Sequence, residues 1–169
     1  MKDPQRKKVC FIGASAVGKT CIVTACSGKG FCSEYLSTLG VAVSTLAISV
    51  QERLREIVIW DIKGETEFYR IPQSYLHGMD GYVIVADGTR ASTLGHALIL
   101  RTRMEEIAGD TPHMLLINKF DLSDLWEVSP SRLSSAHQQV RNVHTCSARS
   151  EISVRSAMEK FSREMWGLK

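Results

Sequence analysis

The sequence lacks any apolar run near the about 18 residues that a membrane-spanning helix needs, and its N-terminus lacks a signal-peptide core. It also lacks a Cys-x-x-Cys pair, and its five cysteines are odd in number, which argues against a disulfide framework and against structural zinc. The sequence also lacks a strong excess of charge of either sign, because 21 Lys and Arg against 18 Asp and Glu leave a net charge of only +3. We therefore expect a cytoplasmic protein that binds neither nucleic acid nor a membrane.

The one basic cluster lies at the N-terminus, with Lys2, Arg6, Lys7 and Lys8. A polybasic anchor usually needs more charges or a lipid beside it. We interpret this segment as a solvated lead-in to the first strand, with contact to anionic lipid as the alternative.

With 169 residues, of which 44% are hydrophobic and 23% charged, the chain suits a single globular domain over residues 1–169. Strand-prone segments are expected at residues 9–12, 41–50, 54–61, 81–87, 113–118 and 143–146. Helical segments are expected at residues 21–26 and 93–108, from Ser129 and Pro130 onward, and at 154–165. This alternation predicts an α/β fold with a mostly parallel sheet, in which residues 41–61 form an antiparallel hairpin.

Residues 13–20, with the sequence GASAVGKT, match the pattern of a phosphate-binding P-loop between a strand and a helix. Gly13 and Gly18 tolerate the φ values that let backbone N–H groups point at phosphate oxygens. The following helix offers the positive end of its dipole. Lys19 would reach the β- and γ-phosphates, and the Thr20 hydroxyl would bind Mg²⁺.

Further polar residues follow the ends of other strands, where the loops of a parallel sheet share one edge. Asp61 and Gly64, in the segment Asp-Ile-Lys-Gly, would hold Mg²⁺ opposite Thr20 and approach a γ-phosphate closely. Alone, this segment is also an ordinary turn. Its position after a strand and together with a P-loop favours the functional interpretation.

The segment Asn118-Lys119-Phe120-Asp121 indicates guanine. The Asp121 carboxylate can accept from the ring N–H and the exocyclic amine of guanine, and a buried carboxylate would be unsatisfied by adenine. Such a mismatch discriminates by about 10⁴-fold or more. Asn118 can tie the base to the P-loop, and the Lys119 stem can lie along the ring. The alternative for a lone segment of this kind is an exposed charged turn.

Residues 146–149, with the sequence CSAR, follow the last strand, where a backbone N–H would bond the guanine carbonyl. Phe31 would stack on the base, although a loop phenylalanine that packs on its own domain is about as common.

Together these motifs resemble the small GTPases of the Ras superfamily, over nearly the whole chain, and most closely the Rab branch. The resemblance implies a three-layer P-loop GTPase fold with a six-stranded, mostly parallel sheet and about five flanking helices. It also implies nucleotide contacts from the following residues: Gly13, Ser15, Ala16, Val17, Gly18, Lys19, Thr20, Cys21, Phe31, Tyr35, Thr38, Gly64, Asn118, Lys119, Asp121, Ser147, Ala148 and Arg149.

The resemblance further implies a molecular switch. Mg²⁺ would be held by Thr20, Asp61 and, in the GTP state only, Thr38, so that switch I (about 31–41) and switch II (about 62–77) loosen after hydrolysis. Catalysis would rest on Lys19, Thr38, Gly64 and Glu65. Partners would be an exchange factor, an activating protein and effectors, and we expect a monomer.

The chain departs from the family pattern at Glu65, where relatives usually carry glutamine. A glutamate only accepts hydrogen bonds, and its charge would repel the γ-phosphate by about 3 kcal/mol at about 5 Å and an effective dielectric of about 20. We therefore expect slow intrinsic hydrolysis unless a neighbour offsets the charge. Lys63, in place of the usual small alanine, is the candidate; a solvent-facing lysine is the alternative.

A second departure is at the C-terminus, which has no cysteine for prenylation. Either the protein has no lipid anchor, or the sequence ends before one. In the second case, peripheral association with a membrane is an alternative to a purely cytoplasmic location. We see no internal arginine that would act on the phosphates. The leading hypothesis is a slow Mg²⁺-dependent GTPase, the second a GTP-loaded module that barely hydrolyses, and the third a P-loop kinase or ATPase, which has no use for residues 118–121.

Overall fold

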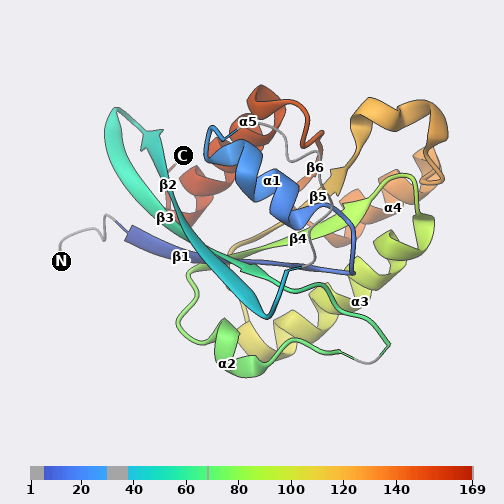
Figure 1. Ribbon diagram of the computed structural model, residues 1–169, viewed down its shortest axis with the longest axis horizontal. Helices are drawn as coiled ribbons and strands as arrows, with labels where there is room; N and C mark the ends of the chain where they lie inside the picture. The colour runs from blue at the N-terminus through green and yellow to red at the C-terminus, as the bar shows by residue number, and fades with distance from the viewer. Residues whose placement is uncertain (1–5, 30–37, 68, 169) are drawn as a thin grey trace.

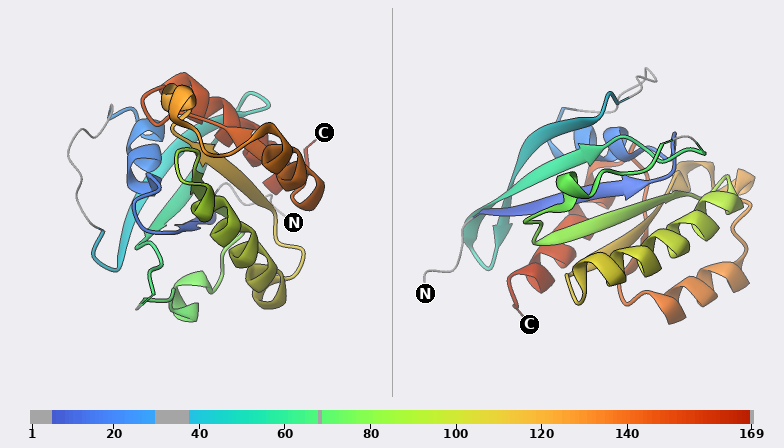
Figure 2. Two further views of the ribbon diagram at one scale, coloured as in Figure 1. Left: turned by 90° about the vertical axis from the view of Figure 1, so that its right-hand side faces the viewer. Right: turned by 90° about the horizontal axis from the view of Figure 1, so that it is seen from below.

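The alternation of strands and helices produces one sheet with helices on both faces (Figure 1, Figure 2), in a computed structural model that describes residues 6–29, 38–67 and 69–168. The strands lie in the order β2-β3-β1-β4-β5-β6, and only the β2–β3 pair is antiparallel. They are β1 (Arg6–Gly13), β2 (Val41–Val50), β3 (Arg53–Ile62), β4 (Gly81–Asp87), β5 (His113–Asn118) and β6 (Val143–Thr145). The predicted six-stranded, mostly parallel α/β sheet is confirmed.

The central strands are covered by helices on both faces, and their nearly continuous apolar sequences suit that position. Every residue of β4 is buried, which is typical of a strand between two helical layers. At the edge, β2 and β3 form the predicted hairpin. Its two-residue turn places Gln51 and Glu52 at φ 50° and 61°, the positive values that a tight hairpin turn between right-twisted strands needs.

In the described part of the chain, two α-helices cover one face of the sheet and three cover the other, and a 3-10 helix, η1 (Phe120–Leu125), follows β5. The α-helices are α1 (Lys19–Cys26) and α5 (Glu151–Met165) on the first face, and α2 (Gln73–Leu76), α3 (Ala91–Ala108) and α4 (Pro130–Gln139) on the second (Figure 1, Figure 2). Neighbouring residues of one strand contribute to opposite cores: Phe11 packs with α1 and α5, whereas Ile12 packs with α3. Because successive side chains of a strand point to opposite faces of the sheet, the apolar residues of each central strand are divided between two cores.

The helix starts follow from capping chemistry. Ser129 accepts a hydrogen bond from the Arg132 N–H at 3.3 Å, with Pro130 at the first helical position, as predicted. The predicted apolar face of the last helix is buried along its length, at Val154, Ala157, Met158, Phe161 and Met165.

Two expectations need correction. The basic residues at the N-terminus are not all a solvated lead-in, because β1 already begins at Arg6. The Lys7 ammonium donates to the Met165 carbonyl, and the Lys8 ammonium donates to the carbonyls of Tyr75 and His77, each at 2.7 Å. The last strand also ends at Thr145, one residue earlier than expected. Within the described residues, no helix combines the length and the apolar character needed to cross a bilayer.

Candidate nucleotide-binding site

The loops that follow the parallel strands meet at one edge of the sheet, and Asn118 at the end of β5 joins three of them. Its amide N–H donates to the Val17 carbonyl of the P-loop at 3.1 Å, and its amide oxygen accepts from the Ala148 N–H at 3.0 Å. Gly18, at φ 98°, has no room for a side chain, because a Cβ there would lie 2.3 Å from the Asn118 amide nitrogen. The sequence motifs are therefore neighbours in space.

The P-loop lysine is buried within this loop. Lys19 is 6% exposed, and its ammonium donates to the Ala14 carbonyl at 2.9 Å. Burial lowers the pKa of Lys19 to about 8, against the opposing influence of Asp61 and Glu65. The hydrogen bonds of this buried ammonium go to backbone carbonyls, and a buried ammonium gains more from an anionic ligand than an exposed one would.

Three oxygen-bearing side chains that sequence reasoning assigned to Mg²⁺ lie together. The Thr20 hydroxyl donates to Asp61 at 2.5 Å and lies 2.8 Å from the Thr38 hydroxyl. The second carboxylate oxygen of Asp61 is buried and has no hydrogen-bond partner among the described residues. Burial raises the pKa of Asp61. Hard oxygen donors with one unsatisfied carboxylate oxygen fit Mg²⁺, which would supply the missing partner.

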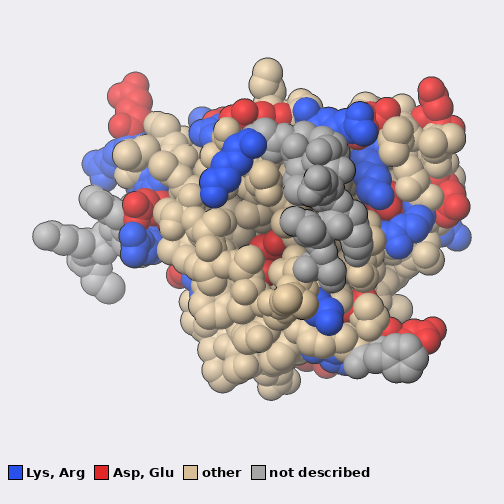
Figure 3. Space-filling view, viewed as in Figure 1, with Lys and Arg blue, Asp and Glu red and all other residues tan. Residues whose placement is uncertain are grey.

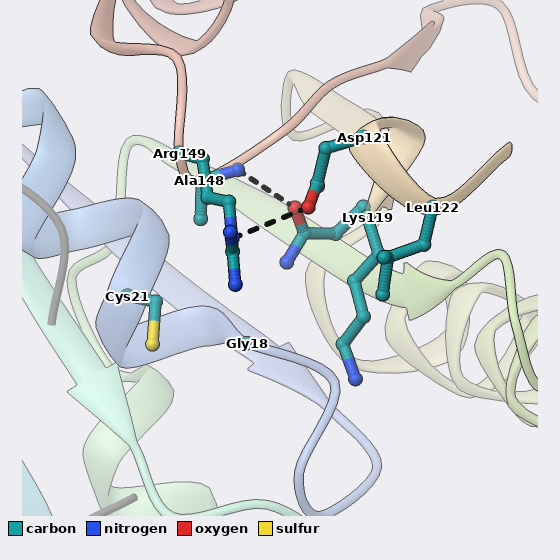
Figure 4. Close-up of a pocket in the computed structure, with 8 residues that line it drawn as sticks. Gly18, Cys21, Lys119, Asp121, Leu122, Ala148 and Arg149 are labelled. Carbon is teal, nitrogen blue, oxygen red and sulfur yellow. Dashed lines mark hydrogen bonds and ion pairs between the residues drawn. The ribbon is translucent and has the colours of Figure 1, made fainter. Parts of the chain in front are cut away.

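A cavity of about 240 Å³ opens beside the P-loop (Figure 4). It is lined by Gly18, Cys21, Asn118, Lys119, Asp121, Leu122, Ala148 and Arg149. Figure 4 shows Asp121 and Arg149 facing each other at one side of this cavity, with Gly18 and Cys21 at the other. All of the lining residues except Leu122 were predicted from the sequence to contact the nucleotide.

Asp121 is less buried than the discrimination argument assumed. Its side chain is 27% exposed, with one oxygen 3.3 Å from the Arg149 guanidinium and the other accepting from the Ser147 hydroxyl at 2.7 Å. A backbone N–H of residues 146–149 was expected to bond the guanine carbonyl, and one of these, the Ala148 N–H, donates to the Asn118 amide oxygen. A base that covers Asp121 would therefore have to complete its desolvation.

The remaining predicted residues of the P-loop lie on the turn itself. Ala16 is exposed at φ 60°, and Ser15 is half-buried beside Gly64. A Cβ on Gly64 would lie 2.5 Å from the Ser15 Cα, so only glycine allows this close approach. Phe31 and Tyr35, predicted to contact the base and the phosphates, lie outside the described residues.

The Glu65 carboxylate points toward α3 and the segment after Gly64. Its side chain is fully buried and accepts from Arg103 at 2.5 Å and from the Ile71 N–H at 3.1 Å. Arg70 lies 3.3 Å and His96 lies 3.2 Å from its other oxygen. Burial lowers the pKa of His96, so the two guanidinium groups supply the positive charge.

Lys63 is not the residue that offsets the Glu65 charge. Its ammonium lies over the Tyr69 ring, 4.9 Å from the centroid, in a cation–π contact. The charge is instead compensated by Arg70 and Arg103, which the sequence interpretation did not consider. Repulsion of the γ-phosphate by an uncompensated glutamate therefore loses its basis.

Charged side chains of both signs occur on the face seen in Figure 3, mainly along its upper part and its margins, and much of the rest of this face is uncharged. This distribution agrees with the small net charge of +3.

The sheet order, the P-loop and the grouped strand-end motifs define a class of protein, the small P-loop GTPases. The family model of the Ras family matches residues 8–166 of the chain. Rab-10 of Caenorhabditis elegans is 34% identical over 152 residues, which cover 89% of this chain and 76% of that protein. The chain therefore belongs to the Ras family and is a Rab-like small GTPase.

Other relatives agree with this assignment. Rab-10 of Diplobatis ommata is 31% identical over 164 residues, covering 94% of this chain and 80% of that protein. Rab-8A of Bos taurus is 29% identical over 161 residues, covering 94% of this chain and 77% of that protein. Membership in this family indicates, in general terms, a GTP-binding switch protein with GTPase activity.

Proposed function

We propose that this chain is a guanine-nucleotide switch that binds GTP and GDP with Mg²⁺ and hydrolyses GTP slowly. Switch I (about 31–41) and switch II (about 62–77) would change between the two states and select partners. The observation that carries the proposal is the Asn118 amide, which joins the P-loop to the loop of Ala148 beside the cavity that Asp121 lines.

The residues of the site divide into a phosphate end and a base end. At the phosphate end, the N–H groups of the P-loop and the Lys19 ammonium would bind the phosphates. At the base end, Asp121 would accept from guanine, while Arg149 and Ser147 hold its carboxylate in place. The Lys119 stem lines the same cavity and would lie along the ring.

Mg²⁺ would be held by Thr20, Asp61 and, with GTP, Thr38, and would neutralise charge on the phosphates. The Thr20 and Thr38 hydroxyls lie 2.8 Å apart, so the chain can bring both to one ion. Gly64, against the P-loop, would place its N–H near the γ-phosphate.

Slow hydrolysis follows from the contacts of Glu65 rather than from repulsion. A side chain that orients the attacking water must be free to accept from that water and donate to the reaction centre. The Glu65 carboxylate only accepts, and Arg103 and the Ile71 N–H already occupy it. An activating protein would therefore have to supply catalytic groups, and an arginine from a partner is worth about 10³–10⁵ in rate.

The partners are proposed from the family: an exchange factor, an activating protein and effectors that recognise the switches. We further propose a monomeric, cytoplasmic protein. A GTP-loaded module that barely hydrolyses is the second candidate, and the buried, fully engaged Glu65 favours it.

One experiment separates these functions. The nucleotide released from the purified protein is identified, and GTP hydrolysis is followed over time with Mg²⁺. Mostly GDP with measurable turnover supports the slow switch, whereas mostly GTP with no turnover supports the module. Bound ATP would contradict both and favour a P-loop kinase or ATPase.

A further inference from the structure

A buried carboxylate at the end of β4 lies between the two ends of the nucleotide site. The Asp87 side chain is fully buried, and its Oδ1 accepts from the Thr89 N–H at 2.9 Å and the Thr89 hydroxyl at 2.7 Å. Its Oδ2 lies 2.7 Å from the Lys119 ammonium and 3.0 Å from Arg90 Nε. Burial alone would raise the pKa of Asp87, but these donors lower it, so Asp87 is ionised.

Arg90 extends this network to the P-loop. Its Nη2 donates to the Ser15 carbonyl at 3.1 Å, across 75 positions of the chain. One guanidinium thus contacts Asp87 with one nitrogen and the P-loop with another. The planar fork of arginine suits such a two-sided contact, whereas a lysine can offer only a point charge.

The loop that carries Arg90 is fixed to the base-binding segment. The Gly88 N–H donates to the Asn118 carbonyl at 3.0 Å, and the Trp126 indole N–H donates to the Lys119 carbonyl at 2.9 Å. Gly88 lies so close to the Trp126 ring that a Cβ would be 2.1 Å from it. Arg90 therefore projects from a loop packed against the base end of the site.

We propose that Arg90 is a positioning residue that, through Asp87, couples the P-loop to the base-binding segment 118–121 and slows nucleotide release. The inference rests on the proposed function, because it concerns the same site. Ser15 and Ala16 lie on the turn of the P-loop, where Ser15 is half-buried and Ala16 is exposed. The Ser15 N–H donates to the Glu65 carbonyl at 3.0 Å, and the Ser15 carbonyl accepts from Arg90, so Arg90 is a second restraint on the turn through which the phosphates would leave.

The electrostatics support the same role. The Arg90 guanidinium is close enough to Lys19 to help lower its pKa, after the larger contribution of burial. Two cations near one P-loop attract a polyanion such as a nucleoside diphosphate. Losing Arg90 therefore removes both a mechanical restraint on the P-loop and a positive charge near the phosphates.

The test is the release rate of a fluorescent GDP analogue from the full chain with Mg²⁺. We expect Arg90→Met to release it about tenfold faster, which equals about 1.4 kcal/mol. Arg90→Lys should fall between Arg90→Met and the wild type. Arg132→Met, which removes an exposed arginine of α4, is the matched control and should release GDP at the wild-type rate.

A second readout separates positioning from general stability. In GDP-bound Arg90→Met, amide hydrogen exchange should become faster in residues 14–18. The thermal unfolding midpoint of Arg90→Met should equal that of the Arg132→Met control. Adding Arg90→Met to Asp87→Asn should speed GDP release by clearly less than the tenfold expected for Arg90→Met alone, because the restraint through the Asp87 carboxylate is already weakened and mainly the loss of positive charge is added.

The outcomes are distinct. Release at the wild-type rate from Arg90→Met, or equal acceleration in Arg132→Met, overturns the inference and leaves the proposed function intact. If Arg90→Met does not fold, Arg90→Lys decides: faster release supports the inference, and wild-type release overturns it. A wild-type protein that binds no GDP contradicts the proposed function itself.

Discussion

At the scale of single residues, the proposal of slow hydrolysis depends on the buried contacts of Glu65. Gly64, which we propose to lie near the γ-phosphate, has its backbone against Ser15. The Glu65 side chain turns away toward α3. Its charge is compensated there by Arg103 and, from the segment after Gly64, by Arg70. The carboxylate forms ion pairs with both guanidinium groups, whereas an uncharged amide would keep only hydrogen bonds from them, so the carboxylate is held more firmly than an amide would be.

Replacing this carboxylate by an amide should release the side chain. We expect Glu65→Gln to hydrolyse GTP about tenfold faster in a single turnover, because glutamine binds Arg103 more weakly and can both accept from water and donate. Glu67→Gln, at an exposed carboxylate of the same segment, is the control and should leave the rate unchanged. A rate for Glu65→Gln at or below the wild-type rate would refute the engagement argument.

At the scale of secondary-structure elements, the same contacts join the segment that we propose as switch II to α3. The described part of switch II has little regular structure, with α2 only four residues long, so its position depends on side-chain contacts. The Arg103 guanidinium from α3 and the Ile71 N–H within the switch meet at one carboxylate. Removing one partner of a buried ion pair leaves the other charge without compensation.

The expected consequence is a looser switch II in Arg103→Met. Amide hydrogen exchange of residues 65–76 in the GDP-bound protein should become about tenfold faster or more, since a hydrogen bond to a charged group is worth about 1.5–3 kcal/mol. The matched control is Arg101→Met, which breaks the ion pair of Arg101 with Glu105 on the same helix. Equal exchange in wild type and Arg103→Met would show that the pair does not hold the switch.

Elements with a repeating pattern could be predicted from the sequence. The buried run of β4, the apolar face of α5 and the cap at Ser129 each depend on residues close together in the chain. The contacts of Glu65 could not be predicted in the same way. Arg103 comes 38 positions later, on a helix whose orientation depends on the packed sheet, and an arginine there has no motif of its own.

At the scale of the whole molecule, parallel strand order explains why widely separated motifs form one site. The P-loop, Asp61, Asn118 and Ala148 all follow strands whose carboxyl ends share an edge, and this was predictable once the α/β pattern was recognised. The chain of contacts from Lys119 through Asp87 to Arg90 and Ser15 was not predictable from the sequence. It depends on how the loop of Gly88 packs against Trp126, for which the sequence has no motif.

The central claim is that this edge forms a pocket selective for guanine nucleotides. Its most direct test is competition for a bound fluorescent GDP analogue, with Mg²⁺ present, by unlabelled GTP or ATP. We predict that GTP displaces the analogue at concentrations about 10⁴-fold lower than ATP, because Asp121 has partners on guanine that adenine lacks. Displacement by ATP at the same concentration as GTP would contradict the account.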